Sequence, residues 1–212
     1  MKYFYIDTTS NYLYTGVVDN NSLIFEIKQK FDYDLSTMAL SKIAEVFNEN
    51  NINPKDINKI ILVNGPGSFT GCRIGITIAK IYAWSLNIPI TVISSLEAMA
   101  TTNLDYDFYV PVIDARRDYV YSGIYDRDGN SVMKDQFMKK SVLETAVNGM
   151  TSNFTFITND SIELNGEVNK YNPDILKIVE KFKDREEINP HLIDANYLKL
   201  TEAEENLNDR NC

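Results

Sequence analysis

The stretch that decides the fold of this chain reads NGPGSFTGCRIGITIAK and spans residues 64–80. An apolar run at residues 60–63 leads into it, and a helical pattern that continues to about Leu86 follows it. Glycines and a proline between these segments predict a tight turn with positive φ angles. The hydroxyl of Ser68 or Thr70 can cap the new helix. The stretch therefore predicts a strand, a turn and a helix in direct succession.

This turn has two interpretations. Free N–H groups at a helix start can bind an anion, so the turn could contact a nucleotide phosphate. Its glycines are spaced G-x-G-x-x-x-G, however, which matches neither a P-loop nor a dinucleotide-binding motif. For this turn taken alone, we favour the interpretation that it is purely structural and binds no ligand. The candidates for nucleotide contact are Asp7, Gly65, Gly67 and Ser68.

Composition places the chain among globular proteins. Its 212 residues are 44% hydrophobic and carry a formal charge of −9, and 212 residues suffice for one large or two small domains. No apolar run approaches the roughly 18 residues of a membrane span, and the two cysteines fit a reducing compartment, so we expect a cytoplasmic location without a membrane partner. Acidic protein repels phosphate, so we do not expect the isolated chain to hold nucleic acid.

Histidine content restricts the possible chemistry. His191 is the chain's single histidine, so a histidine-based metal site is excluded. A peptidase with a serine nucleophile would have to pair Ser68 with His191, and nothing in their spacing supports that pairing. A surface loop position is the simpler interpretation of His191.

Hydrophobic patterning predicts two halves. In the first half, strands are expected at residues 2–7, 11–18, 22–31, 60–63 and 89–93, with helices at 37–47, about 70–86 and 94–100. In the second half, strands are expected at 108–113, 119–125, 131–137 and 154–157, with helices at 141–147 and 173–182, the latter with Pro173 in its first turn. Each half begins with three strands and continues with helices and strands, which indicates a weak structural repeat. We therefore predict an α/β fold of mixed sheets flanked by helices, with lobes at residues 1–103 and 104–212.

The central helix carries two stripes. Small side chains recur every four residues at Gly71, Gly75, Ala79 and Ala83, and bulky ones form a neighbouring stripe at Ile74, Ile78, Ile81 and Leu86. We expect the bulky stripe to face the sheet and the small stripe to admit another helix at short distance. That other helix could be the chain's own helix at residues 37–48 or a helix of another subunit.

Five sequence segments together resemble the TsaB (YeaZ) family of bacterial tRNA threonylcarbamoyladenosine (t6A) accessory proteins. These segments are residues 6–9, 65–80, 93–97, 114–121 and 197–204. They are similar to the opening strand of that family, its glycine-rich signature, and its VSSLEA, DARR-x-x-VY and YLRL-x-EAE motifs. The resemblance covers the whole chain, although residues 135–190 match poorly. A histidine usual at the start of the family's first helix is missing, since residues 34–37 read Asp-Leu-Ser-Thr here.

The resemblance implies an actin-like ATPase (ASKHA, ribonuclease H-like) fold with two lobes. Working members of that superfamily hold phosphate with a D-x-G-T loop, and the corresponding loop here is Asp7-Thr8-Thr9-Ser10. Thr9 replaces the glycine, and its side chain hinders close approach of a phosphate. We therefore expect no competent ATP site in this chain, and we assign ATP or ADP to partner subunits or to the junction with them. An ATP-binding, kinase-like protein remains the alternative.

The resemblance also implies partners. It predicts a non-catalytic subunit that binds TsaD, with TsaE, for threonylcarbamoyl transfer to N6 of A37 in ANN-decoding tRNAs. Contact with tRNA is expected only indirectly, through the complex, and the chain alone is expected to form a homodimer. Relatives use their first two helices for these contacts, so the predicted partner-binding residues are Gly71, Gly75, Ala79, Ala83, Met38 and Lys42.

One further motif alternates charge beside a strand, at residues 114–118. An internal ion-pair turn is the simpler interpretation, and such a turn contributes little to stability if it is exposed. The sharper interpretation is that Asp114, Arg116, Arg117 and Asp118 mark the cleft between the halves or the partner surface.

Overall fold

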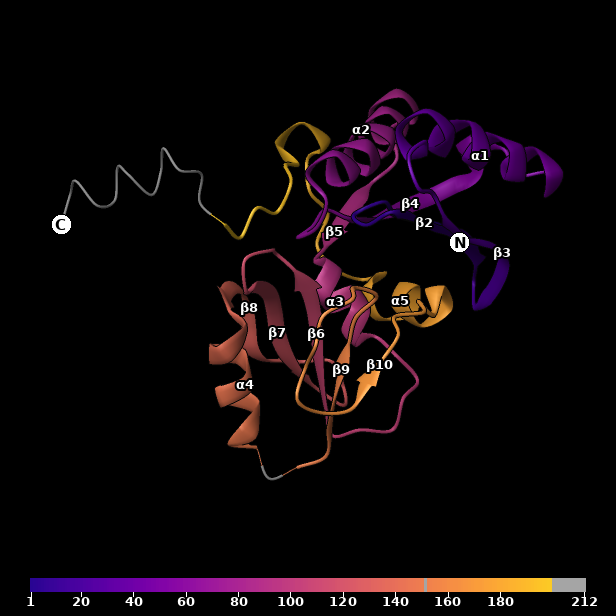
Figure 1. Ribbon diagram of the computed structural model, residues 1–212. Coiled ribbons are helices and arrows are strands. Elements are labelled where there is room, and N and C mark those ends of the chain that lie inside the picture. Colours follow the sequence, from indigo (N-terminus) through magenta and orange to yellow (C-terminus); the bar gives the residue numbers. More distant parts are fainter. Residues whose placement is uncertain (151, 200–212) are drawn as a thin grey trace.

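The computed structural model describes residues 1–150 and 152–199. It consists of two lobes, each built on a five-stranded mixed sheet (Figure 1). For the tail of the chain the sequence also predicts a helix capped by Thr201, and this segment lies outside the described residues. Within the described part of the chain, no helix is both long and apolar enough to cross a membrane.

The first sheet has the strand order β3-β2-β1-β4-β5. Its strands are β1 (Lys2–Asp7), β2 (Tyr12–Asp19), β3 (Ser22–Lys30), β4 (Ile57–Val63) and β5 (Ile90–Ile93). Strands β1, β2 and β3 form an antiparallel meander, and β4 and β5 continue from β1 in parallel. Helices α1 (Leu35–Glu49) and α2 (Phe69–Leu86) cover one face. A short 3-10 turn, η1 (Pro54–Asp56), leads into β4.

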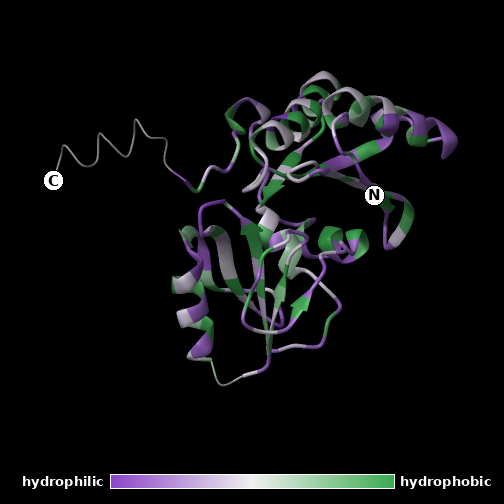
Figure 2. Cartoon of the chain, in the orientation of Figure 1, coloured by the Kyte–Doolittle hydropathy of each residue, from purple (hydrophilic) through white to green (hydrophobic). Residues whose placement is uncertain are grey.

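The second sheet repeats this topology, with the strand order β10-β9-β6-β7-β8. Its strands are β6 (Phe108–Asp114), β7 (Tyr119–Asp126), β8 (Ser131–Lys139), β9 (Phe154–Ile157) and β10 (Val168–Asn169). Pairing is again antiparallel in the meander and parallel beyond it. Helix α4 (Lys140–Asn148) packs on one face, where its residues alternate between polar and apolar (Figure 2). The predicted repeat is therefore confirmed, and it extends to strand order and direction.

The two lobes exchange helices. Helix α3 (Ser95–Ala100) follows the last strand of the first sheet but packs on the second, against Tyr109 and Tyr125. Helix α5 (Ile175–Phe182) follows the last strand of the second sheet but packs on the first, where Ile178 and Phe182 join the cluster of Tyr5. The expected boundary at 103/104 separates the sheets, but residues 175–182 belong spatially to the other lobe.

Smaller differences from the sequence prediction are local. Strand β10 was not expected, because two residues give no periodic signal. The loop at residues 158–167 stands where the first lobe has α2, so the repeat is incomplete. Pro173 lies before the helix, since Asp174 is the N-cap of α5 and its side chain accepts a hydrogen bond from the Lys177 amide.

Candidate functional site

A cleft of about 830 Å³ lies where the strand ends of both sheets meet. Its walls come from the loop after β1, the start of α2, the loop after β6 and the loop after β9. They include Asp7, Tyr12, Tyr14, Lys30, Gly67, Ser68, Phe69, Arg116, Asn159 and Tyr171. Ligand pockets in proteins commonly enclose roughly 300–1,000 Å³. This cleft is therefore large enough for a small molecule, and its lining decides whether it suits a nucleotide.

Asp7 lies at the end of β1 and is almost completely buried. Its Oδ1 atom accepts hydrogen bonds from the backbone N–H of Thr9 at 2.8 Å and from the Thr9 hydroxyl at 2.7 Å. Burial raises the pKa of the Asp7 carboxyl to about 6, and the Thr9 hydrogen bonds oppose this shift. The Asp7 carboxylate at the end of β1 is thus hydrogen-bonded by Thr9, in the turn that directly follows the strand.

Close packing between the loop after β1 and the start of α2 explains the glycines at 67 and 71. A Cβ at Gly67 would lie 2.2 Å from the Thr9 carbonyl oxygen, and one at Gly71 would lie 2.1 Å from the Thr8 carbonyl oxygen. The Ser68 amide donates to the Thr9 carbonyl at 2.6 Å, and the Gly71 amide donates to the Ser68 hydroxyl at 3.2 Å. The Ser68 and Gly71 amides, two of the N–H groups at this helix start, are therefore engaged by the chain itself.

Three of the four candidates for nucleotide contact, Asp7, Gly67 and Ser68, line the cleft. Gly65 is not among the lining residues: a Cβ there would lie 3.1 Å from the Asn196 carbonyl oxygen, and its φ is +117°. Its carbonyl oxygen accepts a hydrogen bond from the Ser95 amide at 2.9 Å. Gly65 thus serves the junction between β4, α3 and the C-terminal segment. Nucleotide contact by these residues stays a prediction.

The small-residue stripe of α2 points inward. Gly71, Gly75, Ala79 and Ala83 are all buried within the chain. A Cβ at Gly75 would meet the Thr8 hydroxyl at 2.6 Å. Of the bulky stripe, Ile78 is buried but Ile81 is 54% exposed. Ile74 and Leu86 of the bulky stripe are partly buried against the core, so Ile81 alone departs from the expected orientation. Gly71 and Gly75 make room for the loop after β1. Partner binding by the small stripe stays a prediction.

Met38 and Lys42, the predicted partner contacts on α1, lie near the surface. Met38 is 45% exposed, and the Lys42 ammonium donates to Glu45 at 2.7 Å. On α2, Trp84 is 72% exposed. These helices also pack on one another, so α2 does contact the chain's own first helix. Partner binding by Met38 and Lys42 stays a prediction.

The structure separates the residues of the peptidase alternative. His191 lies in a 3-10 turn, η2 (Pro190–Leu192), and packs edge-on against Trp84 with 6.2 Å between ring centroids. Ser68 is the N-cap of α2, and Trp84 lies in its last turn. Residues sixteen positions apart on a helix are separated by about 24 Å. His191 therefore contacts the end of α2 opposite to Ser68, and it cannot act as its base.

The turn at residues 114–118 carries no ion pair. Its carboxylate at Asp114 accepts a hydrogen bond from the backbone N–H of Arg116 at 2.8 Å. Within residues 1–150 and 152–199, neither Arg116 nor Arg117 lies within 4.0 Å of a carboxylate oxygen. The interpretation as an internal ion-pair turn is therefore wrong, and Arg116 lines the cleft.

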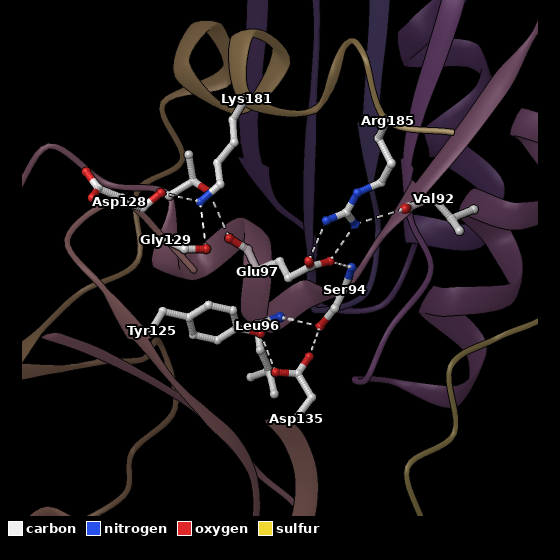
Figure 3. A network of polar contacts seen from close by, with 11 residues as sticks. Val92, Ser94, Leu96, Glu97, Tyr125, Asp128, Gly129, Asp135, Lys181 and Arg185 are labelled. Carbon is white, nitrogen blue, oxygen red and sulfur yellow. Dashed lines mark hydrogen bonds and ion pairs between the residues drawn. The ribbon is translucent and has the colours of Figure 1, made fainter. Parts of the chain in front are cut away.

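A polar network that the sequence did not predict joins the lobes beside α3 (Figure 3). Asp135 on β8 accepts hydrogen bonds from the hydroxyls of Ser94 and Tyr125, and burial raises the pKa of its carboxyl. Glu97 forms two hydrogen bonds with the Arg185 guanidinium, at 2.6 and 2.8 Å. Ser94 and Glu97 form the capping box of α3, which the Ser-x-x-Glu spacing of residues 94–97 indicates, but nothing in the sequence indicates the partners of these side chains in the second lobe and at Arg185. No group of acidic, cysteine or histidine side chains in the described residues could hold a metal ion.

Comparison with known proteins agrees with this architecture. The family model described as "TsaD: tRNA N6-adenosine threonylcarbamoyltransferase" matches residues 34–172. The chain is 31% identical, over 94% of its own length and 94% of the relative's, to the tRNA threonylcarbamoyladenosine biosynthesis protein TsaB of Bacillus subtilis (strain 168). It is 26% identical to the TsaB of Buchnera aphidicola subsp. Acyrthosiphon pisum (strain APS), over 66% of this chain and 67% of that protein. The solved structure of YeaZ from Pseudomonas aeruginosa shares the fold, with a TM-score of 0.79 and 17% identity over 93% of this chain and 99% of that one.

Two sheets of identical topology that exchange helices across a central cleft define a two-lobed α/β protein of the actin-like (ASKHA) type. Within that class, the match along nearly the whole chain is decisive. The chain belongs to the TsaB (YeaZ) family.

Proposed function

We propose that this chain is a non-catalytic accessory subunit in the synthesis of t6A. In this proposal a TsaD subunit, together with TsaE, transfers the threonylcarbamoyl group to N6 of A37 in ANN-decoding tRNAs. The observation that carries the proposal is the 31% identity to Bacillus subtilis TsaB over 94% of both chains, since that protein is described by its role in t6A biosynthesis.

The geometry of the loop after β1 supports a non-catalytic role. The Thr9 carbonyl oxygen accepts the Ser68 amide at 2.6 Å, so this amide is engaged by the chain itself rather than free for a phosphate. Ser68 and His191 lie toward opposite ends of α2, which excludes the Ser68–His191 pair that a peptidase would need. We assign ATP or ADP to the partner subunits or to the junction with them.

Exposed apolar side chains on the first two helices support a partner surface there. Met38 and Leu40 on α1 and Ile81 and Trp84 on α2 are all at least 45% exposed. Large apolar side chains clustered on exposed helices are typical of interaction sites. We call the exposed side chains Met38, Leu40, Ile81 and Trp84 the outer helix face. We propose that this face binds TsaD in the complex and a second copy of this chain when it is alone. The buried small stripe contributes indirectly, because it fixes α2 against the sheet.

Substitution of this face tests the proposal. We expect Met38→Glu combined with Ile81→Glu to weaken binding to TsaD at least tenfold, which corresponds to about 1.4 kcal/mol, since it places two charges in an apolar interface. The matched control is Val132→Glu combined with Val142→Glu, which introduces the same charges at exposed apolar positions of the second lobe. Co-elution with TsaD and circular dichroism measure assembly and folding. Unchanged co-elution of the Met38/Ile81 variant would exclude this face as the interface.

A further inference from the structure

Unpaired cations gather at one end of the second lobe. Arg116 and Arg117 occupy the β6–β7 turn, and Lys139 and Lys140 lie where β8 meets α4. The Tyr119 amide donates to the Arg116 carbonyl at 3.1 Å, and the Lys140 amide donates to the Asp118 carbonyl at 2.8 Å, so the two sites are adjacent. Among the described residues, none of these four cations forms an ion pair, whereas Arg127 and Arg185 elsewhere are paired.

Aromatic rings lie among these cations. Tyr119 stacks on Phe137 with 4.7 Å between centroids and 8° between planes. The Lys199 ammonium lies 5.6 Å from the centre of the Phe137 ring. The two rings are partly exposed, and Lys199 is exposed. This end of the second lobe therefore presents both cations and aromatic surface to solvent.

The C-terminal segment continues this surface onto the first lobe. Figure 1 shows the segment leaving the first lobe and passing the gap between the two sheets. The Tyr197 ring stacks on Phe69 at 5.5 Å and 20°, and the Arg73 guanidinium lies 4.8 Å from the centre of the Phe69 ring. Tyr197 and Phe69 are both about half exposed. Tyr197 and Lys199 thus connect the aromatic pairs of the two lobes.

We call this surface the basic–aromatic rim. It consists of Arg73, Arg116, Arg117, Lys139, Lys140 and Lys199 with Phe69, Tyr119, Phe137 and Tyr197. Carboxylates nearby are Asp114, Asp118, Asp160, Asp194 and Glu163, whose carbonyl oxygen accepts the Lys140 ammonium at 3.1 Å. Asp114, Asp160 and Asp194 each accept a backbone N–H group. Among the described residues, the rim thus sets six cations beside five carboxylates, in a chain whose formal charge is −9.

We infer that the basic–aromatic rim contacts single-stranded RNA of the tRNA substrate within the assembled complex. Guanidinium and ammonium groups bind phosphates, and partly exposed aromatic rings stack on unpaired bases. A rim of cations alone would suit an acidic peptide equally well, and the interleaved rings favour RNA. The identity of the RNA rests on the proposed function. This inference departs from the expectation that tRNA is reached only through partner subunits.

The acidic balance of the whole chain limits this contact to the complex. Repulsion of phosphate by a net charge of −9 keeps the affinity of the isolated chain low. When TsaD holds the tRNA, the effective concentration of that tRNA near the rim is high. Weak contacts between the rim and the tRNA then add to the affinity of the whole complex.

The test measures tRNA binding by the complex of the full chain with TsaD and TsaE over a range of salt concentrations. The probe is an unmodified ANN-decoding tRNA, and the variant is Arg116→Gln with Arg117→Gln. Two lost phosphate contacts should lower the slope of log K against log salt by about 1 to 2. The charge-matched control is Lys55→Gln with Lys134→Gln, at exposed cations outside the rim. We expect the control to match the wild type in affinity and slope.

Each other outcome overturns the inference in a distinguishable way. Equal losses in variant and control would indicate a general charge effect. Wild-type affinity and slope in the Arg116/Arg117 variant would exclude the rim while leaving t6A formation, and hence the proposed function, intact. Loss of co-elution with TsaD, or displacement by an acidic peptide but not by a single-stranded oligonucleotide, would assign the rim to a protein partner. If the double variant unfolds, Lys199→Gln replaces it, with an expected fall in slope of about 0.7 to 0.9. A wild-type complex that neither assembles nor forms t6A would reject the proposed function itself.

Discussion

Thr9 stands where a working phosphate loop carries glycine, and its contacts show what one residue changes. Its amide and hydroxyl hold Asp7, and its carbonyl oxygen accepts the Ser68 amide. The glycines that suggested a ligand instead allow this loop to approach α2. The sequence shows that Thr9 replaces the glycine. It does not show the contact between Thr9 and Ser68, because these residues are some sixty positions apart and no local pattern indicates such a contact.

The close approach at Gly71 predicts a large effect of a single methyl group. Gly71→Ala places a Cβ about 2.1 Å from the Thr8 carbonyl oxygen, so backbone must move. We expect the free energy of unfolding to fall by about 2–4 kcal/mol in urea denaturation. Gly149→Ala is the control, because its nearest neighbouring atom lies at 3.7 Å and its φ is −80°. That variant should be unchanged or more stable by up to about 1 kcal/mol. Equal effects of both substitutions would refute the role given to Gly71.

Burial of Asp7 predicts a pH-dependent stability. The pKa of its carboxyl is raised from 3.8 to about 6 in the folded chain, so the native state binds more protons than the unfolded state between these values. Stability therefore falls as pH rises from about 4 to 6, by up to about 3 kcal/mol, and this loss is absent in Asp7→Asn. The difference in unfolding free energy between variant and wild type should shift in favour of the variant by that amount between pH 4 and 7. Parallel pH profiles would show that Asp7 is not the titrating group.

At the scale of elements, the periodicity of the sequence predicted the individual strands and helices, which depend on neighbouring residues. All strands of the two meanders and helices α1 to α5 were expected, because alternation, helical spacing and caps are written in neighbouring residues. The exchange of α3 and α5 was not expected. The apolar face of an eight-residue helix such as Ile175–Phe182 specifies burial but not the sheet that covers it. The close approach of the loop after β1 to Gly71 and Gly75 was not expected for a related reason, since a small-residue face suits a close loop as well as a second helix.

This exchange predicts that the first half of the chain does not fold by itself. A fragment of residues 1–103 lacks α5, so the face of the first sheet that carries Tyr5, Val18 and Ile61 is uncovered. We expect the fragment to aggregate or to lack a cooperative transition, and co-expression with residues 104–212 to restore the fold. Size-exclusion chromatography and near-UV circular dichroism measure both. A monomeric 1–103 fragment with cooperative unfolding would contradict the packing described for α5.

At the scale of the whole molecule, the two lobes enclose a cleft, and the outer helix face on α1 and α2 and the basic–aromatic rim are the surfaces that we propose for partners. The sequence indicated the family and the degenerate phosphate loop. It did not indicate the rim, because Arg73, Arg116 and Lys199 come together only through the fold.

The most direct measurement of the central claim is t6A formation in a reaction reconstituted from TsaD, TsaE, ATP, threonine-derived substrate and unmodified ANN-decoding tRNA, followed by nucleoside mass spectrometry. We predict that t6A forms only when this chain is added, and that the chain with Asp7→Asn supports the same rate, because Asp7 serves its own turn. Full t6A formation without the chain would contradict an accessory role. Loss of activity in a folded, TsaD-bound Asp7→Asn chain would contradict a non-catalytic one.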